Sequence, residues 1–263
     1  MRNPTDMAAA RADGRPISMV TCYDTWSARI IAATDIDCIL VGDSVAMVMH
    51  GHDTTIPADV DMMRLHVAAA RRGAPERLLI ADMPFLAHRK GLRAAMEAVD
   101  VLMKAGAQGV KIEGAGDTVD LIRHIVASGV PVMGHLGLTP QSIHAFGGYR
   151  VQGRGEEAAA AIRAEALRLQ DAGCFALVLE VVPAALAAEV TEVLEIPTIG
   201  IGAGPHTSGQ VLVLQDLLGM QPEFKPHFLR TFLDGFELLR EALDGYDEAV
   251  KSGAYPSDEE SYR

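Results

Sequence analysis

The chain has 263 residues and a formal net charge of −12 at pH 7, and 49% of its residues are hydrophobic although only 5% are aromatic. An acidic chain repels phosphate backbones, so we expect no nucleic-acid partner. No apolar run reaches the roughly 18 residues of a membrane span, and no segment of signal-peptide length follows the first residues. We therefore expect a cytoplasmic protein without a membrane partner.

Three cysteines, Cys22, Cys38 and Cys174, are spread along the chain. Their odd number and wide spacing provide neither a disulfide framework nor a Cys-x-x-Cys metal clip. Two of them fall in predicted strands, and the third lies just before one. We expect buried, reduced thiols, which suit a cytoplasmic location.

Eight short apolar segments predict β-strands that are buried on both faces. They cover residues 17–23, 37–43, 78–82, 108–113, 130–135, 175–181, 197–201 and 210–215. Continuous runs of Val, Ile, Leu and Ala are typical of parallel sheets whose two faces are both covered.

Amphipathic or alanine-rich segments between most of these strands predict helices. They cover residues 58–73, 91–105, 117–128, 155–172, 184–194 and 226–251. The piece after the seventh strand is too short for a full helix. Strand and helix alternating eight times indicate an α/β fold, a closed (βα)8 TIM barrel, and the length fits. We expect one domain over residues 1–263 with a C-terminal helical segment at about 226–251.

Three acidic residues close consecutive predicted strands: Asp43, Asp82 and Glu113. In barrels of this kind the active site lies at the carboxyl ends of the strands, where these side chains would lie next to one another. Three hard oxygen ligands favour Mg²⁺. The alternative is that each acid caps the following helix or pairs with a nearby cation. One acid alone would favour that alternative, but three on consecutive strands favour a metal site.

Other polar residues surround this expected centre. Lys111 shares a face of its strand with Glu113, and it would either anchor a substrate carboxylate or form a structural ion pair. Ser44 follows Asp43 and would either hold a carboxylate near the metal or only begin the turn. His135 ends the fifth strand and would bind substrate or metal, with substrate the better expectation for a single histidine.

Glu180 ends the sixth strand, across the barrel mouth from the three acids. A carboxylate with apolar neighbours such as Val178 and Val182 is a suitable general base. The alternative is a helix-capping glutamate. We expect Glu180 to be the catalytic base.

Two further motifs favour competing interpretations. Residues 200–204 (GIGAG) form either a phosphate site after the seventh strand or a tight turn without a ligand. The pair His50 and His52 resembles the zinc-binding His-x-His of metal-dependent amidohydrolases. That pair belongs at the end of the first strand, however, and here it follows the second, so the match is partial.

The sequence closely resembles the ketopantoate hydroxymethyltransferase family. The matching segments are 21–24, 41–44, 51–55, 71–75, 81–85, 110–114, 134–141, 146–149, 151–154 and 199–204. The stretch 134–154 is the most specific of them. Ala46 stands where the family pattern suggests glycine, and the resemblance is loose from about residue 216 on.

The resemblance implies a barrel of the phosphoenolpyruvate/pyruvate-binding type that holds Mg²⁺ through Asp43, Asp82 and Glu113. It implies that the 2-oxo acid chelates this metal and contacts Ser44 and Lys111, with Glu180 as base. The implied reaction transfers a one-carbon unit from 5,10-methylenetetrahydrofolate to 3-methyl-2-oxobutanoate, giving 2-dehydropantoate for pantothenate synthesis. A homo-oligomer, commonly a decamer, is implied as well.

Two alternatives remain beside this expectation. One is a lyase or mutase of the same barrel superfamily that acts on 2-oxo acids, which would share the acids but should lack the 134–154 signature. The other is a non-catalytic barrel subunit, which should have lost Glu180 or a metal acid. None of these residues is missing from the chain.

Overall fold

The structure is a computed structural model that describes residues 1–262. The chain divides into two compact units. The first, Met1–Val213, carries the barrel, and the second begins at Leu214. No helix among residues 1–262 is both long and apolar enough to cross a bilayer.

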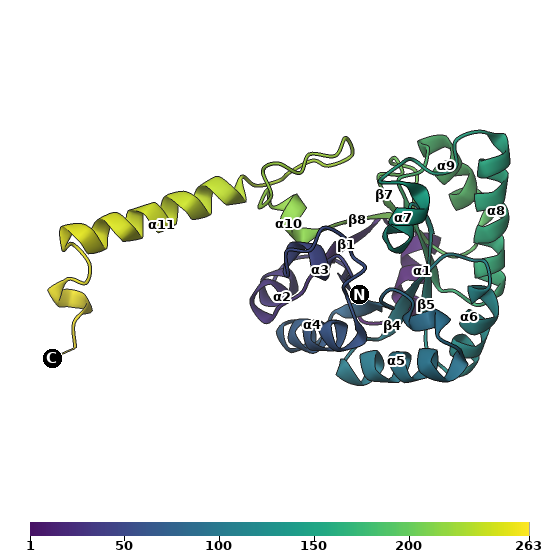
Figure 1. Cartoon of the computed structure of the whole chain (residues 1–263), viewed down its shortest axis with the longest axis horizontal. Coiled ribbons are helices and arrows are strands. Elements are labelled where there is room, and N and C mark those ends of the chain that lie inside the picture. Colours follow the sequence, from purple (N-terminus) through teal and green to yellow (C-terminus); the bar gives the residue numbers. More distant parts are fainter. Residues whose placement is uncertain (263) are drawn as a thin grey trace. The chain divides into compact units, whose positions relative to one another are not determined.

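A closed barrel of parallel strands in chain order forms the centre of the first unit, which confirms the predicted fold class (Figure 1). The strands are β1 (Ile17–Thr21), β2 (Cys38–Val41), β3 (Leu78–Asp82), β4 (Gly109–Glu113), β5 (Val132–Gly137), β6 (Ala176–Glu180), β7 (Thr198–Ile201) and β8 (Gly209–Leu212). Strand β8 pairs with β1, so no strand edge is left open.

Five site residues were predicted to end a strand, and three of them do. Asp82, Glu113 and Glu180 are the last residues of β3, β4 and β6. Asp43 instead lies in the turn after β2, which ends at Val41. His135 lies inside β5, because its neighbours go on pairing with β6 as far as Gly137. The pairing places Asp82 beside Lys111 and Glu113 beside His135.

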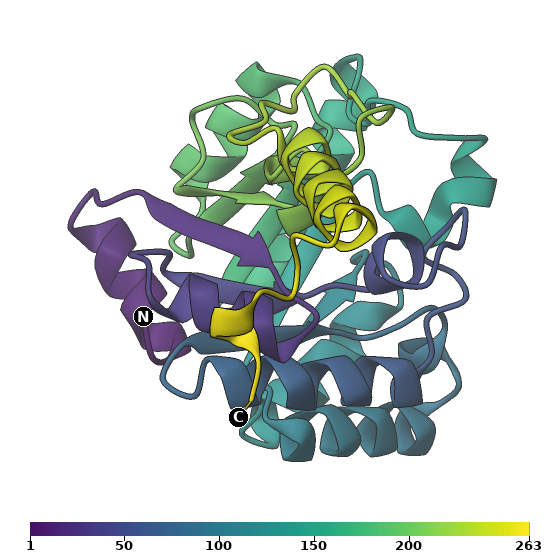
Figure 2. The same ribbon diagram turned by 90° about the vertical axis from the view of Figure 1, so that its left-hand side faces the viewer.

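Helices and short helical turns connect the strands, and the longer helices cover the outside of the barrel (Figure 1). They are α2 (Thr25–Ala32), α3 (Val45–Val48), α4 (Val60–Gly73), η1 (Ala87–Arg89), α5 (Leu92–Ala105), α6 (Thr118–Ala127), η2 (Pro140–Ser142), α7 (Ile143–Phe146), α8 (Glu156–Asp171) and α9 (Ala184–Val193). Figure 2 shows the blue helices α4 and α5 packed side by side. No helix lies between β7 and β8, as expected.

A helix that the sequence analysis did not predict, α1 (Pro4–Ala12), precedes the barrel. Its buried residues Met7 and Ala10 belong to the same core cluster as the strand residues Met19 and Ile80. The sequence does carry a start signal, because Asn3 accepts a hydrogen bond from the N–H of Asp6 in a capping box. The helix is stabilised by this cap and by burying its apolar face against the barrel.

The second unit contains α10 (Leu214–Leu217), α11 (Gly235–Ser252) and η3 (Asp258–Glu260). The predicted helix at 226–251 is therefore correct only from Gly235 onward. The N–H groups of Phe232 and Gly235 donate to the carbonyls of Leu217 and Leu218. Because these groups bond to the turn after α10, the residues before Gly235 do not form helical hydrogen bonds.

Candidate active site

The three acids expected at the metal centre are all buried at the carboxyl end of the barrel. Asp43, Asp82 and Glu113 are 4%, 2% and 5% exposed. None of them is the N-cap of the next helical element, since α3, η1 and α6 have Ser44, Leu86 and Asp117 in that position. Buried carboxylates without a capping role require another source of compensation.

Asp43 and Asp82 are directly connected. The backbone N–H of Asp43 donates to Oδ2 of Asp82 over 3.0 Å. A Cβ at Gly42 would lie only 2.8 Å from Oγ of Ser44, so glycine leaves room for the Ser44 hydroxyl next to this contact. Burial and the neighbouring charges of Asp82 and Glu113 raise the pKa of Asp43 well above its ordinary value.

Lys111 is the buried cation of the site. Its Nζ lies 3.1 Å from Oδ1 of Asp82 and 3.1 Å from Nδ1 of His135. Burial alone would lower the lysine pKa, but the charges of Asp82, Glu113 and Asp43 outweigh burial and raise it. The pairing of Lys111 with Asp82 agrees with the alternative given above, in which the two residues form a structural ion pair. Glu113 faces His135 instead, and Asp43 accepts a hydrogen bond from Gln141.

Gln141, from the loop after β5, joins two of the acids. Its side-chain Nε2 donates to Oδ2 of Asp43 over 2.8 Å and to the carbonyl of Met83 over 2.9 Å. Its backbone N–H donates to Oε2 of Glu113 over 3.1 Å. Burial tends to raise the pKa of Glu113, but His135, Lys111 and this N–H outweigh burial and lower it.

His135 lies between two carboxylates. Its Nδ1 is 3.5 Å from Oε1 of Glu113, and its Nε2 is 3.3 Å from Oε2 of Glu180. Burial and Lys111 favour the neutral ring, but the two carboxylates outweigh them and raise the pKa of His135. When the ring is neutral, the ammonium of Lys111 can only donate to Nδ1, so Nε2 carries the proton and faces Glu180.

Glu180 is more accessible than the other acids, with its side chain 18% exposed. It does not cap α9, whose N-cap residue is Pro183. Val181 directly after it has φ = 48°, an unusual left-handed conformation for a β-branched residue. The N–H of Val181 donates to the carbonyl of Ile201, which fixes this turn. The strained turn positions Glu180 at the rim of the site.

The site carries more negative than positive charge. Among the buried groups Asp43, Asp82 and Glu113 face one lysine and one histidine. Oδ1 of Asp82 and Oε1 of Glu113 are buried and lack a hydrogen bond of good geometry within the described residues. Hard oxygen donors with unsatisfied negative charge are the donor set that a divalent cation such as Mg²⁺ prefers.

The three acids are not already arranged around one ion position. In residues 1–262, no group of three or more His, Cys, Asp and Glu side chains is arranged to hold one ion. The direct connection in the structure is between Asp43 and Asp82, while Glu113 is engaged by Gln141. Mg²⁺ is commonly held by one or two carboxylates together with waters and substrate, so two acids are a sufficient protein contribution.

Two residues of the site were not assigned a role from the sequence. One is Gln141, and the other is Tyr23, which is fully buried and whose hydroxyl lies 2.7 Å from Oγ of Ser44. Burial raises the pKa of Tyr23, so the phenol stays protonated. Both residues stand in segments that carry the family resemblance, and their polar character beside buried strands was the available signal.

Residues 200–204 serve packing. A Cβ at Gly200 would lie 2.8 Å from Oγ1 of Thr207, and one at Gly204 would lie 2.4 Å from Cβ of Ala184. The glycines are therefore required by neighbouring protein atoms, which agrees with the interpretation as a tight turn.

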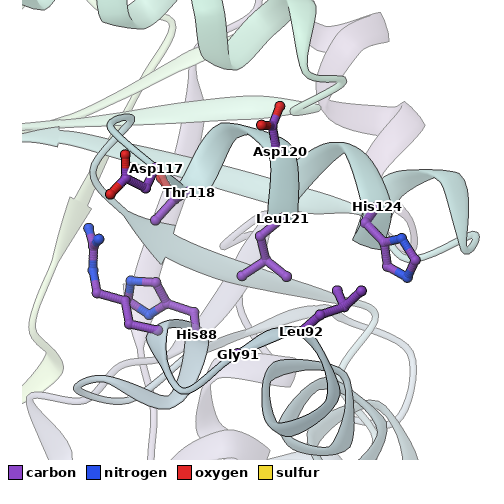
Figure 3. Close-up of a pocket in the computed structure, with 9 residues that line it drawn as sticks. His88, Gly91, Leu92, Asp117, Thr118, Asp120, Leu121 and His124 are labelled. Carbon is purple, nitrogen blue, oxygen red and sulfur yellow. The ribbon is translucent and has the colours of Figure 1, made fainter.

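A separate pocket of about 440 Å³ lies between the start of α5 and helix α6 (Figure 3). Its walls include His88, Arg89 and Leu121. His88 is only 6% exposed, and neither of its ring nitrogens has a hydrogen-bond partner in the described part of the chain. Burial and Arg89 lower the pKa of His88 to about 4, although Glu113 opposes the shift.

Comparison with known sequences decides the family. A sequence model of the ketopantoate hydroxymethyltransferases matches residues 2–258. The chain belongs to this family. The 3-methyl-2-oxobutanoate hydroxymethyltransferase of Bdellovibrio bacteriovorus is 56% identical over 262 residues, which is 100% of both chains. Its Coxiella burnetii counterpart is also 56% identical, covering 97% of this chain and 96% of the relative.

Membership in the hydroxymethyltransferase family makes the chain a transferase. The resemblance was expected to be loose from about residue 216, but the family match continues to residue 258. A relative from Francisella tularensis subsp. novicida, 48% identical, covers the whole chain as well.

Solved structures with the same fold include enzymes with other activities. A phosphonopyruvate hydrolase in complex with oxalate and Mg²⁺ has a TM-score of 0.63 at 12% identity, covering 99% of this chain and 93% of the other. A 2,3-dimethylmalate lyase has a TM-score of 0.58 at 17% identity, covering 100% and 92%. At such identities the likeness concerns the fold alone. The closer sequence matches favour the transferase family over a lyase or mutase.

Proposed function

We propose that the chain transfers a hydroxymethyl group from 5,10-methylenetetrahydrofolate to 3-methyl-2-oxobutanoate, giving 2-dehydropantoate. The observation that carries this proposal is the buried charge cluster at the barrel mouth, with Glu180 beside it. The curated names of relatives that are 56% identical over nearly the whole chain support the choice of reaction.

The metal of this proposal is Mg²⁺, held by the acids Asp43, Asp82 and Glu113. The hydrogen bond that joins Asp43 to Asp82 supports a common site for these two ligands, and the Gln141 N–H holds Glu113 in the same cluster. Once bound with the 2-oxo acid, Mg²⁺ would supply Lewis acidity that makes the C–H next to the ketone more acidic.

Glu180 is the base of the proposed reaction. Its carboxylate would accept the proton from C3 of the 2-oxo acid, and the resulting carbon nucleophile would bond to the methylene carbon of the folate. Both C–N bonds that hold this carbon to the folate break, and one water molecule supplies the hydroxyl oxygen, so the products are 2-dehydropantoate and tetrahydrofolate. The position of Glu180 at the accessible edge of the site, with its side chain 18% exposed, supports contact with a substrate that enters from the barrel mouth.

The remaining polar groups would position the substrate. Lys111 offers an ammonium for the substrate carboxylate, and Ser44 offers a hydroxyl that the buried phenol of Tyr23 orients. His135 presents Nε2 toward Glu180, where it can orient the base. In this proposal Lys111 and Ser44 bind the substrate, and His135 orients the base.

The proton-abstraction step can be tested without folate. Glu180→Gln keeps the shape of the side chain but cannot accept a proton, so the variant should bind 3-methyl-2-oxobutanoate with Mg²⁺ while deuterium exchange at C3 in heavy water falls at least about 100-fold. NMR measures the exchange directly. Glu189→Gln on the outer face of α9 is the matched control. Exchange at the parent rate in Glu180→Gln would remove Glu180 as the base.

The proposal also includes a cytoplasmic location and a homo-oligomer, with ten copies as the expected number. The three cysteines are buried and free, as a reducing compartment favours. Helix α11 exposes an apolar stripe along one side, formed by Phe236, Leu239, Leu243, Tyr246 and Val250. A regular apolar stripe of this kind is typical of a protein contact surface.

A further inference from the structure

Two histidines that the proposed reaction does not use meet beside the barrel mouth. Nε2 of His50 lies 2.9 Å from Nε2 of His66. His50 follows α3 in the loop between β2 and α4, and His66 belongs to α4. The sequence analysis paired His50 with His52, but the structure brings His50 to a histidine sixteen residues away instead.

The opposite side of the His66 ring is already fixed. Nδ1 of His66 lies 2.6 Å from the backbone carbonyl of Tyr23, which can only accept a hydrogen bond. Nδ1 therefore carries the proton, and Nε2 presents a lone pair toward His50. Histidines that bind metals almost always donate their other ring N–H to a carbonyl or a carboxylate, so His66 has the support that a metal ligand requires.

The nitrogen pair is open to an ion from solution. His50 is exposed and His66 is half-buried. The two rings are nearly perpendicular, at 87° with centroids 5.2 Å apart, so they do not stack on each other. In the metal-free pair, one ring donates Nε2–H to the other. When His50 takes its other neutral tautomer, with the proton on Nδ1, both Nε2 lone pairs can bind one metal ion after a small widening of the gap.

We propose that His50 and His66 form a chelating site for a transition-metal ion such as Zn²⁺, Cu²⁺ or Ni²⁺. Neutral imidazoles favour these ions over Mg²⁺, which prefers oxygen ligands, so the site is chemically distinct from the acid cluster. No third His, Cys, Asp or Glu joins the pair within residues 1–262, so water completes the coordination.

A bound ion would connect the loop after β2 to helix α4. This loop includes Ser44, whose hydroxyl contacts the phenol of Tyr23, and the Tyr23 carbonyl holds His66. The metal site and the rim of the active site therefore share Tyr23. An ion on the pair would hold these elements together and stabilise the folded chain.

The test is a calorimetric titration of Zn²⁺ into the full chain, with Mg²⁺ in excess to occupy the acid cluster. We expect His50→Gln and His66→Gln each to weaken one Zn²⁺-binding event by tenfold or more, or to remove it. His124→Gln, which replaces an exposed histidine on α6, should bind like the parent. Zn²⁺ should also raise the unfolding temperature of the parent but not of His50→Gln.

A spectroscopic measurement identifies the ligands. With Cu²⁺, the electron paramagnetic resonance spectrum of the parent should show coupling to two imidazole nitrogens, and His50→Gln should lose that pattern. If His66→Gln fails to fold, His50→Gln decides alone, because His50 is exposed. Parent-like Zn²⁺ binding and an unchanged Cu²⁺ spectrum in His50→Gln would overturn the proposal. Neither readout requires the transferase reaction.

Discussion

The side chain of Gln141 holds the carboxylate of Asp43 across the barrel mouth, with Nε2 of Gln141 2.8 Å from Oδ2 of Asp43. The two residues are 98 positions apart, and they come from the loops after β5 and β2. The same amide group also donates to the carbonyl of Met83, and the Gln141 N–H donates to Glu113. Gln141 therefore fixes the spacing between two of the proposed metal-site acids.

We predict that Gln141→Ala leaves a folded barrel with a loosened acid cluster. Outer partners of metal ligands typically contribute 10-fold to 100-fold in metal affinity or activity, so Mg²⁺-dependent deuterium exchange should fall by about that factor. Calorimetric Mg²⁺ titration in the presence of the 2-oxo acid should show the matching loss. Gln221→Ala, at an exposed glutamine outside the barrel, is the control. Unchanged Mg²⁺ affinity in Gln141→Ala would show that Gln141 does not position Asp43.

The buried His88 should make stability depend on pH. Its pKa is about 4 in the folded chain, because of burial and Arg89, against an ordinary value of 6.5. A histidine with a lowered pKa favours folding above pH 6.5, and this contribution is lost as the pH falls from 6.5 toward 4. A shift of this size corresponds to about 3 kcal/mol in the free energy of unfolding.

Urea unfolding of the parent and of His88→Gln over this pH range isolates the effect. Both chains lose stability as carboxylates titrate, but only the parent also loses stability through the protonation of His88. The difference between the two should therefore change by about 3 kcal/mol in favour of the variant between pH 7 and pH 4. His144→Gln, in helix α7, serves as the control. A constant difference across the range would show that His88 is not held neutral.

Val181 tests the role of backbone strain beside Glu180. At φ = 48° a residue with a Cβ is disfavoured by roughly 1–2 kcal/mol, whereas glycine is not. Val181→Gly should therefore be more stable than Val181→Ala by about 1 kcal/mol, which reverses the usual order of these residues. The free energies of unfolding provide the measurement. Greater stability of the alanine variant would mean that the left-handed conformation is absent in solution.

The apolar stripe of α11 leads to a prediction about assembly. Leu243 is 68% exposed in the single chain, near the middle of the stripe. A charge introduced there should disfavour burial against another copy, so Leu243→Glu should lower the molar mass measured by light scattering during gel filtration. Glu241→Gln on the neighbouring face should keep the parent mass. A parent protein that elutes as a monomer would contradict the proposed homo-oligomer.

The barrel itself was predictable, because each strand is a short, continuous apolar run and eight such runs alternate with helical segments. All eight predicted strands are present, in order, in one closed sheet. The prediction was less accurate where long-range pairing decides the structure. Helix α11 begins at Gly235 because Phe232 bonds to the carbonyl of Leu217. Helix α1 is a different case, because its capping box is a local signal that was overlooked.

The site was partly predictable for a similar reason. Asp82, Glu113 and Glu180 stand at strand ends, and parallel strands bring their ends to one rim, so their proximity follows from the fold class. Lys111 and His135 follow from the pairing of neighbouring strands, but Gln141 comes from a loop whose course no local pattern specifies. For this reason the roles of Gln141 and Tyr23 emerged only with the structure.

The sequence alone determined the fold class, the family and the acids at the barrel mouth, because strand periodicity and motif spacing are local properties of the chain. Only the tertiary structure decided which partner each polar group has. It pairs Lys111 with Asp82, connects Gln141 to Asp43, and sets His50 against His66 rather than His52. The first contact follows from the register of β3 and β4. The other two depend on the path of loops at the end of the barrel, and packing between residues far apart in the chain sets that path.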